Sequence, residues 1–183
     1  MFVCAGNTES FVCAKSVGVG LVQSALNLSR LCLLEKPSTI IFIGTAGSYD
    51  FSTPLLSLYV STQAMQIEES FTLAHSYTPL DNCLQVQGPK TLDLPPAIVN
   101  SSNYIHTDLD FSRRMVQAGI HLENMEFFSV LSVAQYYQIP SFGVFCVTNY
   151  TNAHAHKDFL ASHGQAKARL ETFINQLKDE NVR

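Results

Sequence analysis

The sequence predicts an α/β fold, in which helices alternate with buried strands. Apolar residues recur every three or four positions over residues 127–137 and again over 158–178, which is the period of one helical face. Between these helices, residues 142–147 form a short apolar run, as expected of a strand that is covered on both faces. Pro140 separates the first helix from this strand, because proline lacks the amide donor that the next helical turn needs. This succession favours a sheet flanked by helices.

The remaining elements are expected from short apolar runs and from turn residues. We expect strands at residues 1–4, 11–15, 39–43, 58–62, 83–86 and 97–100, and helices at about 21–34 and 110–118. The first two strands flank a glycine-containing turn, which predicts a hairpin. Thr107 or Asp108 can cap the helix that Gly119 ends. Residues 64–97 are polar and rich in proline and asparagine, so we expect a long excursion from the sheet there.

Length and composition limit the classes of protein that the chain can belong to. The 183 residues predict a single domain, 1–183, that is large enough to bury a substantial core. Hydrophobic residues make up 46% of the chain and charged residues only 14%, so we expect a partner subunit to cover apolar surface in a homodimer or larger homo-oligomer. The net charge of −4, without a basic cluster, disfavours nucleic-acid binding.

The cysteines and the apolar segments predict a cytoplasmic protein without membrane contact. The five cysteines form no Cys-x-x-Cys pair, and most lie inside apolar runs, where a thiol behaves as a small buried hydrophobe. The amino terminus lacks the pattern of a signal peptide, and no segment is long enough to cross a bilayer. His154 and His156 are two residues apart, but no third ligand stands at a suitable spacing, so we predict no metal site.

Two polar groups flank the helix and strand described first, and they predict a ligand site. Thr148 and Asn149 stand at the carboxyl end of the strand, where open α/β sheets place their ligands. Glu126 immediately precedes the helix, so its carboxylate and the Asn149 carboxamide can face one crevice. Each residue also has a simpler interpretation. Glu126 can be a helix N-terminal acid, worth about 0.3–1 kcal/mol, and Asn149 can be a turn former.

These residues resemble the nucleoside phosphorylase and nucleoside hydrolase superfamily. Met125 and Glu126 before a helix, followed by a strand that ends in Thr148 and Asn149, match its ribose and purine motifs, and Glu123 adds a pattern similar to that of futalosine hydrolases. The glycine-rich segments 16–20 and 44–48 match two turns of the superfamily. The resemblance covers about residues 11–178. It implies a three-layer sandwich with a mixed, largely parallel central sheet flanked by helices.

The resemblance also implies the roles of individual residues. Glu126 and Asn149 would be the catalytic residues: Glu126 would hold the ribose together with Met125, and Asn149 would meet the purine together with Thr148. The remaining substrate-binding positions are Ser61 near the attacking nucleophile, Tyr104 and Ile105 at the base, and Gly47 on the cavity wall. Relatives that act on adenine use Asp as a proton donor, whereas a carboxamide such as that of Asn149 both donates and accepts hydrogen bonds. We therefore expect a preference for 6-oxopurines.

The start of the chain departs from the superfamily pattern. Members begin with an additional strand, whose loop carries either phosphate-binding residues or a catalytic Glu. Residues 1–15 resemble the second and third strands, so the first strand is expected to be missing. Glu9 could replace the lost acid, although its position in a turn favours surface exposure. The arginine that phosphorylases use near the second glycine-rich turn is also missing, as Phe42 and Ile43 stand there.

Two functional hypotheses remain open at this point. The first is an enzyme of purine salvage that cleaves the N-glycosidic bond of a purine nucleoside. It would act as a phosphorylase or a hydrolase without a cofactor, and phosphate is a possible co-substrate. The second is a catalytically silent member of the superfamily, which binds a nucleoside or only associates with another subunit. The missing first strand is the main support for the second hypothesis.

Overall fold

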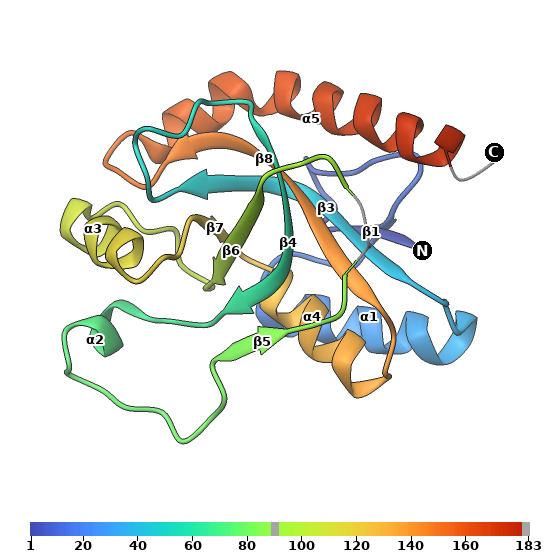
Figure 1. Ribbon diagram of the computed structural model, residues 1–183, viewed down its shortest axis with the longest axis horizontal. Coiled ribbons are helices and arrows are strands. Elements are labelled where there is room, and N and C mark those ends of the chain that lie inside the picture. Colours follow the sequence, from blue (N-terminus) through green and yellow to red (C-terminus); the bar gives the residue numbers. More distant parts are fainter. Residues whose placement is uncertain (89–91, 181–183) are drawn as a thin grey trace.

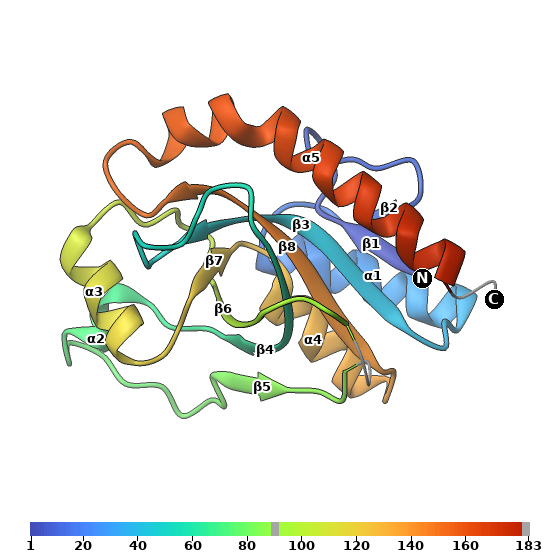
Figure 2. The ribbon, with the colours of Figure 1, turned by 45° about the horizontal axis from the view of Figure 1, so that its top comes forward.

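The protein is a mixed α/β sandwich with helices on both faces of one sheet (Figure 1). The computed structural model describes residues 1–88 and 92–180. Helix α5 (Ala155–Glu180) covers one face of the sheet, and α1 (Leu21–Glu35) and α4 (Phe127–Tyr136) cover the other, as Figure 2 shows. This arrangement confirms the predicted three-layer architecture. Residues 89–91 of the predicted excursion lie outside the described residues.

Within the described residues, the sheet contains eight strands, five of which close into a ring. In chain order the strands are β1 (Phe2–Cys4), β2 (Lys15–Ser16), β3 (Ile40–Ser48), β4 (Leu58–Met65), β5 (Cys83–Gln85), β6 (Pro96–Ser101), β7 (Leu122–Asn124) and β8 (Ser141–Tyr150). The spatial order is β2-β1-β3-β7-β6-β4-β5, and β8 bonds to both β3 and β4. Strands β3, β7, β6, β4 and β8 therefore form a closed circuit. Because β1, β3 and β8 are parallel, their carboxyl ends meet at one edge.

The long helices lie close to the positions that the apolar periodicity predicts. Helix α4 buries Phe127, Val130, Leu131 and Ala134 along the expected face. Helix α3 (Leu109–Gln117) starts at Asp108, whose carboxylate accepts the N–H of Phe111 at 2.7 Å. The excursion after β4 contains a short helix that was not predicted, α2 (Glu69–Thr72).

Three short segments differ from their predicted structure. Strands β1 and β2 pair in parallel, so the expected hairpin is wrong and residues 5–14 form a looping connection. The glycine-rich segment 44–48 belongs to β3 itself rather than to a loop after it. The motif at 123–126, which was expected to be a polar segment before a helix, begins inside the buried strand β7.

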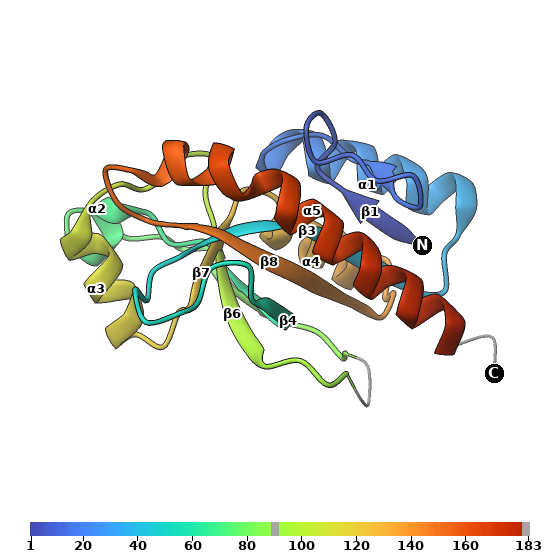
Figure 3. The same cartoon turned by 90° about the horizontal axis from the view of Figure 1, so that it is seen from above.

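Two apolar layers hold the sheet against its helices. Between the sheet and α4, the rings of Phe42, Phe127 and Phe145 lie with centroids 5.0–5.9 Å apart. On the other side, Leu170 and Ile174 of α5 are fully buried against the face of β8 and β3 along which the helix runs (Figure 3). Burying each such side chain stabilises the fold by about 1.5–3 kcal/mol. The layers hold the parallel strands rigidly, and hence the residues at their carboxyl ends.

The surface of α1 bears on the predicted assembly. Its outer face exposes Val22, Leu26, Leu33 and Leu34. Exposed apolar side chains of this kind are what a subunit contact would cover, and the contact stays a prediction. Light scattering at micromolar concentration can test it, and a monomer would contradict it. No helix in residues 1–88 and 92–180 is both long and apolar enough to span a bilayer.

Candidate active site

A cavity of about 300 Å³ opens at the carboxyl ends of β1, β3 and β8. Its wall combines segments that are far apart in the sequence. They are the loop 5–9 after β1, residues 45–47 of β3, residues 123–126, residues 148–149 of β8, the isolated Val19 and Ile105, and Ala155, His156 and Phe159 at the start of α5. Of the predicted site residues, Glu126, Asn149, Met125, Thr148, Gly47 and Ile105 all line this cavity.

Glu126 immediately precedes α4, but its side chain makes no capping hydrogen bond to the helix. Asn124 caps the helix instead, because its Oδ1 accepts the N–H groups of Glu126 and Phe127 at 2.9 and 3.0 Å. The Glu126 carboxylate, on a side chain that is only 3% exposed, instead accepts the N–H of Gly20 at 2.9 Å. The pKa of Glu126 is raised to about 7, mainly by burial; the Gly20 bond opposes this shift, and the charge of Glu9 contributes to it.

Glu9 brings a second carboxylate to the same cavity. The loop after β1 turns back on itself, since the N–H of Glu9 donates to the carbonyl of Gly6 at 2.9 Å. The Glu9 carboxylate accepts the hydroxyl of Thr45 and, at 3.3 Å, its backbone N–H. Burial raises the pKa of Glu9, and the two Thr45 bonds oppose this rise. The side chain of Glu9 is thus half-buried, and its carboxylate is anchored by Thr45 at the cavity.

The position of Glu9 corrects the expectation for the start of the chain. Strand β1 pairs in parallel with β3, and its loop carries an acid into the cavity. A strand with an acidic loop therefore precedes α1, contrary to the expectation that this element is missing. Parallel pairing joins residues that are about forty positions apart, as at Val3 and Phe42, so local sequence does not show it.

Asn149 is held against the neighbouring strand. In the β3–β8 register it stands opposite Gly47, and a Cβ added to Gly47 would lie 3.0 Å from its amide nitrogen, so glycine permits this close approach. The hydroxyl of Thr148 donates to Asn149 Oδ1 at 2.9 Å. Asn149 Nδ2 donates to the carbonyl of Tyr150 at 3.2 Å, which leaves its second N–H for a ligand.

Two predicted site residues lie outside the cavity. Tyr104 is 73% exposed and lies in a separate surface depression with Glu68 and His106, so its position does not support the expected contact with a base. Ser61 is buried within β4, where the strand pairing is irregular between Val60 and Gln63. Its hydroxyl bonds to the backbone of Gln63 at 2.8 and 3.1 Å, so it satisfies the irregular strand instead of facing a nucleophile.

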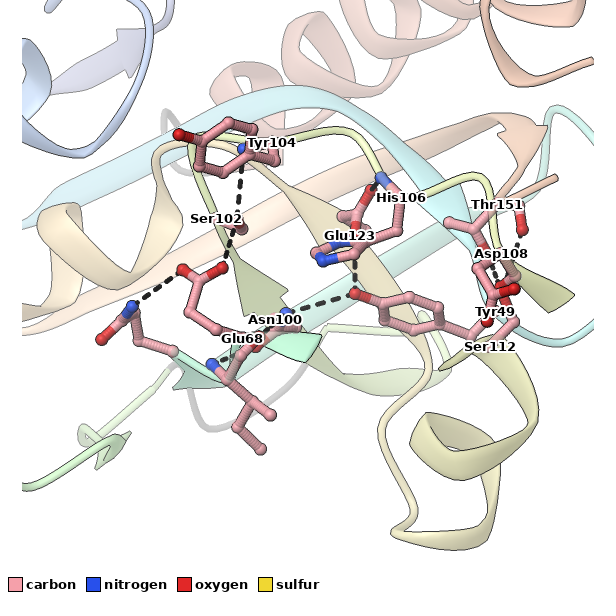
Figure 4. A network of polar contacts seen from close by, with 12 residues as sticks. Tyr49, Glu68, Asn100, Ser102, Tyr104, His106, Asp108, Ser112, Glu123 and Thr151 are labelled. Atoms are coloured by element: carbon pink, nitrogen blue, oxygen red, sulfur yellow. Dashed lines mark hydrogen bonds and ion pairs between the residues drawn. The ribbon is translucent and has the colours of Figure 1, made fainter. Parts of the chain in front are cut away.

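Sequence reasoning missed a polar network behind the cavity wall, shown in Figure 4. The Glu123 carboxylate accepts the hydroxyl of Tyr49 at 2.7 Å and the backbone N–H of His106 at 3.1 Å, and it pairs with His106 Nδ1. Burial lowers the pKa of His106, but the contacts with Glu123 outweigh it, so the pKa is raised. The Glu-x-Met-Glu pattern contains Glu123, whereas nothing in the sequence links it to His106 or Tyr49.

The start of α5 completes the cavity wall. His156 lies in the first turn of this helix together with Ala155, and Phe159 follows one turn later. Among the described residues, no three His, Cys, Asp or Glu side chains gather as a metal site would require. In the part of the chain that the structure describes, the titratable groups on the cavity wall are the carboxylates of Glu9, Glu123 and Glu126 and the His156 imidazole.

Comparisons with known proteins agree with this architecture. The model of the phosphorylase superfamily matches residues 2–120. A futalosine hydrolase from Helicobacter pylori is 15% identical, with a TM-score of 0.82 over 98% of this chain and 96% of its own. The 5′-methylthioadenosine/S-adenosylhomocysteine nucleosidase of the same organism is also 15% identical, with a TM-score of 0.82 over 98% of this chain and 97% of its own.

The corresponding nucleosidase from S. pneumoniae is more distant in sequence. It is 11% identical, with a TM-score of 0.77 over 94% of this chain and 95% of its own. Among curated proteins, no relative matches the sequence. The family model spans more than half of the chain and includes β1, β3 and the Glu9 loop. The protein is thus a member of the phosphorylase superfamily.

Proposed function

We propose that the protein hydrolyses the N-glycosidic bond of a purine nucleoside. The observation that carries this proposal is that two acids of raised pKa, Glu9 and Glu126, line one cavity together with Asn149. Breaking such a bond gives the sugar oxocarbenium character in the transition state. A buried carboxylate near the sugar stabilises that developing positive charge more strongly than water does. The reaction requires no cofactor.

Glu126 is the proposed ribose ligand. Its carboxylate is oriented by the Gly20 N–H, and its backbone is fixed by Asn124. The pKa near 7 means that the acid is readily ionised when a cationic sugar forms beside it. Met125, on the same wall, offers a flexible apolar side chain to a ribose face.

Glu9 is the proposed general base for water. A carboxylate whose pKa is raised above its ordinary value is a stronger base, and it can take a proton from water during attack on the sugar. The cavity wall, as far as the described residues form it, contains neither Arg nor Lys. A phosphate ion would enter beside two acids without a cationic partner, which is unfavourable in a buried site. This charge balance favours water over phosphate as the acceptor.

Asn149 is the proposed base-recognition residue. Thr148 takes one of the two acceptor positions of its amide oxygen, and we propose that the second N–H of the amide is the group offered to a ligand. The corresponding edge of a 6-oxopurine carries two neighbouring acceptors, O6 and N7, whereas adenine has an amino donor beside N7. We therefore propose that a 6-oxopurine nucleoside is preferred. The names of similar solved structures make 5′-methylthioadenosine and futalosine necessary comparisons.

The decisive experiment measures release of the base. Inosine, guanosine, adenosine, 5′-methylthioadenosine and futalosine are incubated with the protein, with and without phosphate, and the products are separated by chromatography. We expect hypoxanthine or guanine to appear at a rate independent of phosphate. Release that requires phosphate would identify a phosphorylase. Binding of a nucleoside without any release would favour the silent member of the superfamily, although β1 and the Glu9 loop remove the main support for it.

Variants of Asn149 test the choice of base in the same assay. Asn149→Asp should weaken inosine-type substrates and admit adenosine, because a protonated carboxyl can donate to N7. Asn149→Leu should abolish base recognition, since a site built for hydrogen bonds discriminates strongly against a mismatch. Calorimetry with hypoxanthine and adenine gives the affinities directly. If both variants bind both bases as the unmodified protein does, Asn149 is only a structural residue at the end of β8.

A further inference from the structure

Glu123 faces the cavity, but its carboxylate bonds mainly to other groups of the protein. Its side chain is 6% exposed and that of His106 8% exposed, so the pair is nearly excluded from solvent. The carboxylate receives three donors, namely the Tyr49 hydroxyl, the His106 N–H and His106 Nδ1 (Figure 4). A carboxylate has about four acceptor positions, so at most one of them remains for a substrate. Most of the bonding capacity of Glu123 therefore serves the groups that it holds.

The group held by Glu123 is the loop between β6 and α3. His106 is bound through both its backbone and its ring, and the ring also stacks on Phe111 of α3 with centroids 4.0 Å apart. The preceding residue, Ile105, lines the cavity although it is 56% exposed. Because burial does not hold Ile105 in place, its position depends on the attachment of its neighbours.

The other side of the loop is attached away from the cavity. The N–H of Tyr104 donates to the Ser102 hydroxyl at 3.1 Å, and that hydroxyl donates to Glu68 at 3.3 Å. Tyr104 thus points into the surface depression that contains Glu68, while Ile105 reaches the cavity. The attachment at His106 is the one that fixes the loop on the cavity side.

Glu123 is itself fixed by the rigid sheet. It lies in β7, and the Tyr49 hydroxyl that donates to it accepts a hydrogen bond from Asn100 Nδ2 of β6 at 3.2 Å. Asn100 is held in turn by two bonds to the backbone of Ile67, at 2.8 and 3.0 Å. The sheet and Tyr49 therefore preorganise the acceptor, and the loop supplies the two contacts from His106.

We propose that His106 and Glu123 form a positioning pair that holds Ile105 on the cavity wall and thereby sets the affinity of the site for the purine base. The proposal rests on the proposed function for the identity of the ligand. If His106 and Glu123 were replaced by an apolar pair of similar size, the core could be equally stable. An apolar side chain at position 123 could not accept the backbone N–H of residue 106, however, so the loop would not be fixed in one place.

The test compares variants of the pair with a matched histidine. His106→Ala should raise KM for the nucleoside by about 10- to 100-fold, the loss of affinity expected when a hydrogen bond to a charged group is removed, and should change kcat much less. His106→Asn, which keeps a donor on a shorter side chain, should recover part of this loss. His121→Ala is the control, because His121 Nδ1 accepts the N–H of Ile98 at 3.0 Å and does not line the cavity.

Two further readouts separate this proposal from the proposed function. Hydrogen exchange of the amides at 104–107 should accelerate in His106→Ala, and the affinity for hypoxanthine should fall by the same factor as KM rises. Because His106→Ala leaves a buried carboxylate with one donor fewer, the double variant His106→Ala/Glu123→Gln is measured alongside it and should show the same loss of affinity.

Three results would overturn the positioning pair: unchanged hypoxanthine binding in a folded variant, a fall in kcat at constant KM, or a wild-type protein that binds no purine base. Failure of the unmodified protein to cleave any nucleoside, with hypoxanthine still bound, would overturn only the proposed hydrolysis. In that case, hydrogen exchange at 104–107 and the affinity for hypoxanthine would still test whether His106 and Glu123 position Ile105.

Discussion

Helices α3 and α4 each begin at an acidic residue, but the two acids are used differently. Asp108 at the start of α3 accepts the N–H of Phe111 at 2.7 Å, as a helix cap does. Glu126 at the start of α4 makes no such bond, because Asn124 accepts the first N–H groups of that helix. The Glu126 carboxylate is therefore available to the cavity.

The difference teaches how an acid at a helix N-terminus can be recognised as functional. When an acid caps its helix, the local hydrogen bond offsets the free-energy cost of removing the carboxylate from water. Glu126 is buried without that local bond, and its pKa rises to about 7 as a result. A buried acid whose structural role is filled by another residue is a candidate for ligand binding.

The largest expected effect is on catalysis. Glu126→Gln keeps the size of the side chain and an acceptor for the Gly20 N–H but removes the negative charge. If the carboxylate stabilises an oxocarbenium-like sugar, kcat should fall by about 100- to 1,000-fold. The matched change at the other helix, Asp108→Asn, should leave kcat within a few-fold. Steady-state kinetics with the best substrate compare the two, and equal effects would remove the distinction between the acids.

The second effect is on stability as a function of pH. The folded pKa of Glu126 is about 7 and its ordinary value is 4.5, so between these values the folded protein binds more protons than the unfolded chain. The free energy of unfolding should therefore fall as pH rises through this window, by roughly 3 kcal/mol from this one group. The raised pKa values of Glu9 and His106 act in the same direction.

Urea unfolding at about pH 5 and pH 7.5 measures this dependence. The loss of stability should be smaller in Glu126→Gln, because an amide does not titrate. A wild-type protein whose stability is constant or rises over this range would show that Glu126 ionises without cost, and the contrast with Asp108 would lose its energetic basis.

The third effect concerns Asn124, which caps α4 in place of Glu126. Asn124→Ala removes the acceptor of two N–H groups and the 3.1 Å bond from Asn124 Nδ2 to the carbonyl of Thr45. We expect a loss of about 2 kcal/mol of unfolding free energy, since a cap and a buried hydrogen bond disappear together. kcat/KM should also fall, because the backbone of Glu126 loses its anchor. Denaturation at constant pH combined with kinetics tests both expectations.

Strong periodicity made much of the fold predictable. Helix α4 and strand β8 follow from the spacing of apolar residues and from Pro140 between them. The motif residues Glu126 and Asn149 line one cavity because they stand at the start of that helix and near the end of that strand. Local sequence is informative here, since each residue's place depends mainly on its own element.

The features that sequence did not predict depend on contacts between distant elements. Strand β1 has only three residues, so its parallel pairing with β3 has no periodicity to reveal it. The burial of Glu9 follows from that pairing, since the loop after β1 is carried against Thr45. His106 and Glu123 likewise meet only because β6 and β7 lie side by side. Such tertiary contacts override the local preference of a polar residue for the surface.

The smallest expected effect completes the comparison of the two helices. Asp108→Ala removes the bond to the Phe111 N–H from α3, and typical caps are worth about 1 kcal/mol. Asp108 does not line the cavity, so kcat and KM should stay unchanged. Urea unfolding and steady-state kinetics on one preparation give both numbers. A variant with normal stability but impaired catalysis would mean that Asp108 acts on the site, and an acid that caps its helix would then no longer count as purely structural.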